Sequence, residues 1–217
     1  LGSFVAIAQG QVGQDHWFAL GRLLTATGAA PALLSWSGSM FEFLMPLLVM
    51  PTYDNTLLDQ TYRAVVRRQI DYGKQRGVAW GISESGYNTT DQHLNYQYRA
   101  FGVPGLGLKR GLAEDLVIAP YATGLAAMID QSAAAKNFKH LAKTGAEGNY
   151  GFYESLDYTA PRLPENKKLA LVQTYMSHHQ GMMLLSMTNV LYDSIIPLRF
   201  HTAPKVQAAE LLLQEQI

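Results

Sequence analysis

Hydrophobic residues recur at helical spacing along most of this chain, and this pattern restricts the possible folds more than any other feature. The clearest case is residues 55–76. One side of this segment is a buried stripe of Leu58, Tyr62, Val65, Val66, Gln69 and Ile70. The other side is charged and carries Arg63, Arg67, Arg68 and Lys74. Such a stripe needs a partner surface to cover it. Few segments alternate apolar and polar residues with a period of two, the pattern of a half-buried strand. The sequence therefore predicts an all-α fold.

Further segments show the same periodicity. We expect helices at residues 15–28, 38–50, from Pro120 onward, 132–143, 166–192 and 203–216. Ser37 or Ser39 can cap the helix at 38–50, and Pro51 stops it. Connections rich in glycine and aromatic residues occupy 77–107 and 145–164. The chain shows no internal repeat or clear linker, so we expect one domain over residues 1–217.

Composition excludes several classes of protein. The 17 basic and 17 acidic residues cancel, which removes the positive surface expected of a general nucleic-acid binder. The absence of cysteine excludes a disulfide scaffold, thiolate zinc sites and cysteine nucleophiles. The most apolar run, residues 40–50, is too short for a membrane span, so we expect no membrane insertion by this segment. Because the chain opens within a pattern and ends within a helix, we expect it to be a piece of a longer protein.

Three short segments combine an acidic residue with aromatic residues and glycines. They are residues 35–42, 80–88 and 150–158, and their acids include Glu42, Glu84 and Glu154. Aromatic faces stack on sugar rings, and paired carboxylates protonate a glycosidic oxygen or attack an anomeric carbon. Carbohydrate chemistry is therefore one interpretation. The alternative is structural, in which each acid is a helix cap or a surface loop residue.

Two other motifs suggest cofactors but do not support them. His178 and His179 are adjacent, so on a helix they project about 100° apart and do not readily face one metal ion. The segment Gly102–Lys109 lacks the Gly-Lys-Ser/Thr order of a phosphate-binding loop, and Pro104 removes an amide donor. We therefore expect no metal and no cofactor.

Seven longer motifs carry a family resemblance that runs from about Phe4 to Gln214. They are Trp36–Glu42, Trp80–Ser85, Tyr96–Tyr98, Phe101–Leu112, Ala119–Thr123, Tyr150–Glu154 and His178–Met182. In order and composition they resemble the glycoamylase-like segment of bacterial cyclic β-1,2-glucan synthases.

The resemblance implies a fold, a setting and an activity. The fold is part of an (α/α)6 toroid-like barrel, as in related endo-β-1,2-glucanases. The setting is the cytoplasmic face of the bacterial inner membrane, where the same polypeptide carries a glycosyltransferase module and a phosphorylase-like module. The activity is cleavage and transglycosylation of linear β-1,2-glucan, which closes it into a ring.

Ring closure replaces one β-1,2 linkage by another, so double displacement is the simplest route. We nominate Glu84 and Glu154 as the two carboxylates; the sequence leaves open which of them is the acid/base and which the nucleophile, and we favour Glu84 as the acid/base. Glu42 is the reserve, because burial in an apolar helix would raise its pKa and suit it to act as an acid.

A wider set of residues is expected to bind the sugar. The aromatic members are Trp36, Trp80, Tyr87, Tyr96, Tyr98, Tyr121, Tyr153 and Tyr158, and the hydrogen-bonding members are Asn88, Arg99, Asp157, His179 and Gln180. A core aromatic with a satisfied hydroxyl is the alternative for each ring. Two other functions stay open at this point: a hydrolase that trims β-1,2-glucan, and a non-catalytic scaffold that binds it.

Overall fold

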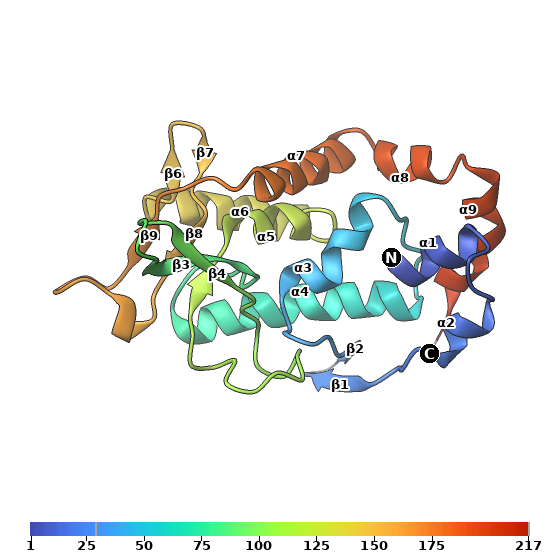
Figure 1. The fold of residues 1–217 in the computed structure, drawn as a ribbon, viewed down its shortest axis with the longest axis horizontal. Coiled ribbons are helices and arrows are strands. Elements are labelled where there is room, and N and C mark those ends of the chain that lie inside the picture. Colours follow the sequence, from blue (N-terminus) through green and yellow to red (C-terminus); the bar gives the residue numbers. More distant parts are fainter. Residues whose placement is uncertain (29, 217) are drawn as a thin grey trace.

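The computed structural model describes residues 1–28 and 30–216 (Figure 1). Within them the α-helices are α1 (Gly2–Ala8), α2 (Asp15–Ala19), α3 (Met40–Leu44), α4 (Leu57–Arg76), α5 (Pro120–Ala126), α6 (Gln131–Lys143), α7 (Ser177–Leu191), α8 (Ile195–Phe200) and α9 (Pro204–Ala209). The described residues also form short 3-10 helices, which are η1 (Met45–Leu48), η2 (Ala160–Arg162) and η3 (Glu210–Gln214).

Short strands connect these helices. They are β1 (Leu24–Thr27), β2 (Ala30–Leu33), β3 (Ser85–Thr90), β4 (Tyr96–Arg99), β5 (Val117–Ile118), β6 (Glu147–Gly148), β7 (Gly151–Phe152), β8 (Ser155–Asp157) and β9 (Ala170–Val172). The pairs β1–β2, β3–β4 and β6–β7 are antiparallel, and β5, β8 and β9 form a three-stranded sheet with β8 in the middle. Figure 1 shows all but β1 and β2 gathered at one end of the molecule, with both chain termini at the other.

The long helix α4 has the boundaries that its sequence dictates. Thr56 caps its N-terminus by accepting a hydrogen bond from the Asp59 N–H, and Gly77 ends it in the left-handed conformation at φ 68°. Its apolar stripe, which includes the fully buried Val65, faces the main core. That core also takes Leu44 from α3 and Leu125 from α5, so three helices share one hydrophobic centre. Helix α5 packs in turn against α6 and α7.

A second, smaller hydrophobic cluster joins the two ends of the chain. Phe4 and Ile7 of α1 and Trp17 of α2 meet Val206 of α9 and Leu213 of η3. Figure 1 shows α1, α2 and α9 near one another at the end away from β3, β4 and β6–β9. The cluster therefore closes the scaffold without reaching the loops between the strands.

Most of the predicted helices are confirmed. The segments expected at 38–50, 55–76, 132–143 and from Pro120 correspond to α3 with η1, α4, α6 and α5. The segment at 203–216 divides into α9 and η3. None of the helices in the described ranges is long and apolar enough to cross a bilayer.

Two helix predictions are wrong over part of their length. The segment 15–28 is helical only to Ala19 and then enters the β1–β2 hairpin, and the segment 166–192 is helical only from Ser177. Residues 170–172 instead pair with β8. Strands of two to six residues are too short to show a clear period of two. The all-α prediction therefore describes the helices but omits the sheets.

The glycine-rich segment after β4 packs against the segment before α3 and forms backbone hydrogen bonds with it. Ser35 bridges Gly107, and the Val103 N–H donates to the Gly38 carbonyl at 3.1 Å. The backbones approach so closely that a Cβ at Gly107 would lie 2.6 Å from the Gly38 nitrogen, and a Cβ at Gly102 would overlap the Ser37 carbonyl oxygen. Positions 102 and 107 therefore require glycine, because the backbone of this segment lies too close to that of residues 37–38 for a side chain to fit.

We expect Gly102→Ala to destabilise the protein by about 1–3 kcal/mol or more, because the added methyl overlaps backbone that has no rotamer to escape into. Gly181→Ala is the matched control, since its Cβ within α7 would meet nothing within 4 Å. It should be neutral or stabilising by up to about 1 kcal/mol. Urea denaturation measures both, and equal midpoints for the two variants would contradict the close-approach account.

Candidate active site

Three carboxylates from distant segments converge at the end of the molecule that carries the sheets. Glu42 lies in the first turn of α3, Glu84 directly precedes β3, and Glu154 directly precedes β8. The negative charge of Glu42 raises the pKa of Glu84, and the charges of both Glu84 and Glu154 raise the pKa of the Tyr98 hydroxyl. The fold therefore assembles one acidic centre from parts of the chain up to 112 residues apart in sequence (154 minus 42).

Glu154 is the most deeply held of the three. Its side chain is 1% exposed, Oε1 accepts the Gly86 N–H at 2.9 Å, and Oε2 lies 2.9 Å from His179 Nδ1. Its own N–H donates to the Thr174 carbonyl at 3.0 Å. A buried carboxylate is costly without such partners, so this set fixes the orientation of Glu154.

His179 is held on both ring nitrogens and on one face. Its ring stacks on Tyr121 with centroids 3.8 Å apart and planes 11° apart, and Nε2 lies 3.2 Å from the Tyr98 hydroxyl. A carboxylate only accepts hydrogen bonds, so with Glu154 ionised this contact uses a proton on Nδ1. His179 is only 1% exposed, so it does not present a surface to a sugar as we expected from the sequence.

The surroundings of Glu84 suit a general acid. Burial raises its pKa above the ordinary value, and the negative charge of Glu42 adds to this, while hydrogen bonding by Tyr98 and the nearby His179 act in the opposite direction. Its backbone is also fixed, because the Tyr121 hydroxyl donates to the Glu84 carbonyl at 3.0 Å. The net upward shift keeps Glu84 protonated at higher pH than a solvent-exposed glutamate.

Glu42 has the opposite character. Burial again disfavours its charge, but hydrogen bonds from Ser37, Ser35 and Ser39 outweigh it and hold the pKa of Glu42 below its ordinary value. Ser39 and Glu42 form a capping box at the start of α3. The expected upward shift at Glu42 is therefore wrong: an apolar sequence context did not reveal the serines that satisfy this carboxylate.

The aromatic residues expected to bind sugar divide by exposure. Trp36 and Tyr98 are 67% and 39% exposed and remain accessible. Trp80 and Tyr121 are 8% and 2% exposed and belong to the core. Trp80 lines a cavity of about 690 Å³ between α4 and α6, and none of the three carboxylates lines that cavity. The remaining members are half-buried: Tyr87, Tyr96, Tyr153 and Tyr158.

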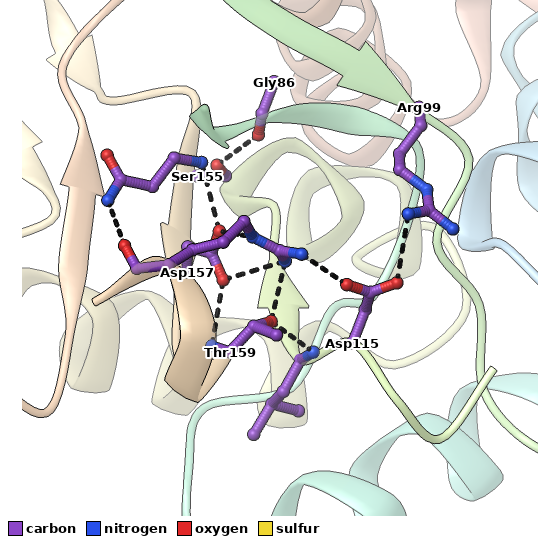
Figure 2. A network of polar contacts seen from close by, with 9 residues as sticks. Gly86, Arg99, Asp115, Ser155, Asp157 and Thr159 are labelled. Atoms are coloured by element: carbon purple, nitrogen blue, oxygen red, sulfur yellow. Dashed lines mark hydrogen bonds and ion pairs between the residues drawn. The ribbon is translucent and has the colours of Figure 1, made fainter. Parts of the chain in front are cut away.

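A buried ion-pair network lies beside the acidic centre (Figure 2). Asp157 is fully buried; its Oδ2 accepts from Arg162 Nε at 2.7 Å and from the Asn88 N–H at 3.0 Å. Arg162 also bonds Asp115 at 2.6 Å, and Asp115 pairs with Arg99 at 3.4 Å. The network uses three residues that we predicted to bind sugar hydroxyls. Asp157 has no accessible surface left for that role, and its carboxylate instead stabilises the strands.

Gln180 and Tyr87 also have structural partners. Gln180 donates to the Phe152 carbonyl at 3.1 Å, and the Arg162 guanidinium lies 5.0 Å from the centre of the Tyr87 ring. Sequence reasoning missed Arg162 and Asp115 because ion pairs between distant segments leave no local pattern. The described residues contain no group of three or more histidine, aspartate or glutamate side chains arranged to hold a metal ion.

The sequence of this chain matches a known protein family. The family described as "Glycoamylase: Putative glucoamylase" matches residues 1–204, and the chain belongs to it. The chain is also 48% identical over 216 residues to cyclic beta-(1,2)-glucan synthase NdvB of Rhizobium meliloti (strain 1021). That match covers all of this chain and 8% of the relative, so the chain spans less than a tenth of the relative's length.

Solved structures share the fold at low sequence identity. An endo-beta-1,2-glucanase from Chitinophaga pinensis, in complex with sophorotriose and glucose, matches 91% of this chain and 47% of its own, with a TM-score of 0.64 at 17% identity. A structure described as a glucoamylase from Bacteroides uniformis gives 0.63 at 17% identity, with 90% and 47% coverage. A beta-1,2-glucanase from Parabacteroides distasonis gives 0.58 at 17% identity, with 88% and 27% coverage. These likenesses define the fold as that of glucanase- and glucoamylase-like proteins.

We expect Arg162→Met to destabilise the protein by about 3–5 kcal/mol, because it leaves the buried Asp157 carboxylate without its cation. Lys74→Met is the control, since the Lys74–Asp71 pair is exposed and should contribute no more than about 1 kcal/mol. Denaturant unfolding followed by circular dichroism measures both. A loss below 1 kcal/mol in Arg162→Met would show that Asp157 is not held by this pair.

Proposed function

We propose that this chain acts on linear β-1,2-glucan, cleaving a glycosidic bond and transferring the released end so that the chain closes into a cyclic β-1,2-glucan. The observation that carries the proposal is the acidic centre, in which the pKa of Glu84 is raised and that of its neighbour Glu42 is lowered. Two carboxyl groups whose pKa values are pushed apart are suited to opposite proton states in one reaction. The 48% identity to part of a cyclic beta-(1,2)-glucan synthase supports β-1,2-glucan as the substrate.

Glu84 and Glu154 are the pair that we assign to the chemistry. Protonated Glu84 gives its proton to the glycosidic oxygen as the bond from that oxygen to the anomeric carbon breaks, and a Glu154 oxygen bonds to the carbon. The reducing-end fragment departs with the donated proton on its new hydroxyl. The hydroxyl at the chain's own non-reducing end then attacks the carbon, Glu154 leaves, and Glu84 recovers a proton from that hydroxyl. Two displacements retain the β configuration. Because Glu154 is buried, substrate binding must open its approach.

Glu42 supports this pair electrostatically. Its serine hydrogen bonds keep it ionised, and its negative charge raises the pKa of Glu84. It is also the alternative attacking carboxylate, since it is half-buried and therefore more accessible than Glu154. Replacing each acid by its isosteric amide distinguishes these roles.

Binding of the glucan is assigned to the accessible part of the predicted set. Trp36 and Tyr98 offer exposed ring surface, and the half-buried Tyr96, Tyr153 and Tyr158 can contribute edges. The apolar face of such a ring can stack on a sugar, and its O–H or N–H can form a hydrogen bond with a sugar hydroxyl. We assign no sugar contact to Trp80, Tyr121 or Asp157.

Hydrolysis of β-1,2-glucan is the second candidate. Two of the structural neighbours are beta-1,2-glucanases, which favours a hydrolytic use of the same fold. The two activities differ only in whether water or a glucan hydroxyl reaches the glycosyl–enzyme intermediate. Product masses separate them: a ring is lighter by one water than a linear chain with the same number of glucose units, whereas hydrolysis gives only linear chains whose summed mass has gained one water.

We further propose the setting of this activity. The relative is a much longer synthase, and the chain covers 8% of it. We place the segment on the cytoplasmic face of the bacterial inner membrane, beside glycosyltransferase and phosphorylase-like modules of the same polypeptide. We also propose that its helices form one part of an (α/α)6 toroid, since the chain matches 47% of the glucanase from Chitinophaga pinensis.

Glu84→Gln and Glu154→Gln should each lower turnover of linear β-1,2-gluco-oligosaccharides by about 10²–10⁴-fold or more, because each removes a proton donor or a nucleophile. Product masses measured over time give the rate. Glu165→Gln, which changes an exposed acid that we assign no role, is the control and should match the parent. Turnover within twofold of the parent in both site variants, with folding confirmed, would favour a glucan-binding scaffold.

The pH profile should follow Glu84. The acid must be protonated, so kcat/KM should fall as pH rises through a pKa above the ordinary 4.5 of glutamate. Glu42→Gln should move this basic limb to lower pH, because it removes the neighbouring negative charge. A limb at or below pH 4.5, or one unmoved in Glu42→Gln, would contradict the assignment of Glu84 as the acid.

A further inference from the structure

Three tyrosine rings meet on the surface next to the segment that carries Glu154. Tyr150 lies in the turn between β6 and β7, Tyr153 follows β7, and Tyr175 lies shortly before α7. The ring centre of Tyr175 is 5.7 Å from that of Tyr150, with planes at 83°, and 5.4 Å from that of Tyr153, with planes at 40°. Tyr175 therefore joins the other two rings into one aromatic surface, and of the three only Tyr153 belongs to the set predicted to bind sugar.

This aromatic surface is open to solvent. Tyr150 is 82% exposed, and Tyr153 and Tyr175 are half-buried. In the part of the chain that the structure describes, no hydrogen bond joins any of the three hydroxyls to another protein group. A single exposed hydrophobic side chain is ordinary, whereas rings gathered on one surface are typical of a place where a ligand binds. Packing in the core therefore does not explain Tyr150.

The protein supports two of the rings on a glycine. A Cβ at Gly148 of β6 would lie 2.5 Å from Cζ of Tyr153 and would overlap the Tyr175 hydroxyl, so only glycine lets both rings rest on this backbone. The hairpin below them is fixed to α7, because Gln180 Nε2 donates to the Phe152 carbonyl at 3.1 Å. A surface that is already in place costs less ordering entropy when a ligand binds.

The aromatic surface adjoins the acidic centre but is separate from it. The Glu154 carboxylate contacts His179, whereas the ring of the preceding residue, Tyr153, packs against Tyr175. Their backbones are joined, since the Glu154 N–H donates at 3.0 Å to the carbonyl of Thr174, the residue before Tyr175. Figure 1 shows the β6–β7 hairpin at the end of the molecule that carries the sheets. A ligand held at the acidic centre must therefore extend beyond it to reach the three rings.

A glucan strand has the chemistry that this surface can bind. The faces of a glucose ring expose C–H groups that stack on a phenol ring, and the hydroxyls around its edge can form hydrogen bonds with phenol oxygens. The three rings carry no charge, which suits a neutral ligand. Because they are inclined to one another, they can contact successive sugar units that face in different directions.

We propose that Tyr150, Tyr153 and Tyr175 form a second glucan-binding site outside the acidic centre, which engages only chains long enough to extend past that centre. This inference rests on the proposed function for its ligand, β-1,2-glucan. The site carries out no chemistry. It adds contacts that short chains do not reach, and it thereby makes the protein select long chains over short ones.

The test measures binding in the absence of turnover. Glu84→Gln is the background, and calorimetry gives the dissociation constants of linear β-1,2-gluco-oligosaccharides of increasing length. Affinity should increase again at the length at which a chain reaches the three rings. Tyr150→Ala should weaken the binding of chains of that length or more by about 3–10-fold, the value of one aromatic stacking contact, and leave shorter chains unchanged.

Matched variants separate stacking from other effects. Tyr150→Phe keeps the ring and should retain most of the affinity for long chains. Tyr192→Ala removes a tyrosine that is 67% exposed at the end of α7, and it should change nothing. Because Tyr150 and Tyr175 touch, Tyr150→Ala combined with Tyr175→Leu should cost less than the sum of the two single effects. Circular dichroism checks that each variant folds.

Each result decides the proposal. An equal loss for short and long chains in Tyr150→Ala would place this ring at the acidic centre and overturn the separate site. No loss at any length would also overturn it and leave the rings to another partner, such as a protein surface.

The same measurement keeps the two proposals apart. A length-dependent loss in a protein whose parent chain does not cleave β-1,2-glucan would support the second site and refute the proposed function. Turnover by the parent chain, with long-chain affinity unmoved in Tyr150→Ala, would refute the second site alone. A folded protein that binds no β-1,2-gluco-oligosaccharide of any length would refute both.

Discussion

The buried contact between Glu154 and His179 is the interaction on which the rest of the acidic centre depends. It joins α7 to the segment before β8, and through the Gly86 N–H it also fixes the start of β3. An unpaired carboxylate at this depth would cost several kcal/mol, so the three segments are held together wherever Glu154 is ionised. The positions of Glu84, which adjoins β3, and of Tyr98 on the paired strand β4 follow from this contact.

A second buried carboxylate holds the same strands in a different way. Glu154 accepts a hydrogen bond from the Gly86 N–H, and Asp157 accepts one from the Asn88 N–H. Two acids three residues apart therefore bind alternate residues of β3. Asp157 is paired with the permanent cation of Arg162, whereas Glu154 is paired with the neighbouring histidine His179. The structural role and the proposed chemical role are thus assigned to neighbouring acids by their partners.

The sequence predicts the helices well and the acidic centre in part. The stripe of α4, the capping of α6 and the proline at the start of α5 are local signals, so they are legible without a structure. Glu84 and Glu154 were selected by their aromatic and glycine neighbours, and the fold does bring them to one place. The burial of Trp80, the serine partners of Glu42 and the Asp157–Arg162 pair depend on tertiary packing, which no local pattern encodes.

The most direct test of the central claim is a crystal structure of the Glu84→Gln variant with a linear β-1,2-gluco-oligosaccharide. The account predicts a glycosidic oxygen within hydrogen-bond distance of the amide at position 84, with the adjoining anomeric carbon facing Glu154 and sugar rings against Tyr98. A glucan bound elsewhere, with no glycosidic oxygen near position 84, would contradict the account and favour a scaffold that binds glucan without cleaving it.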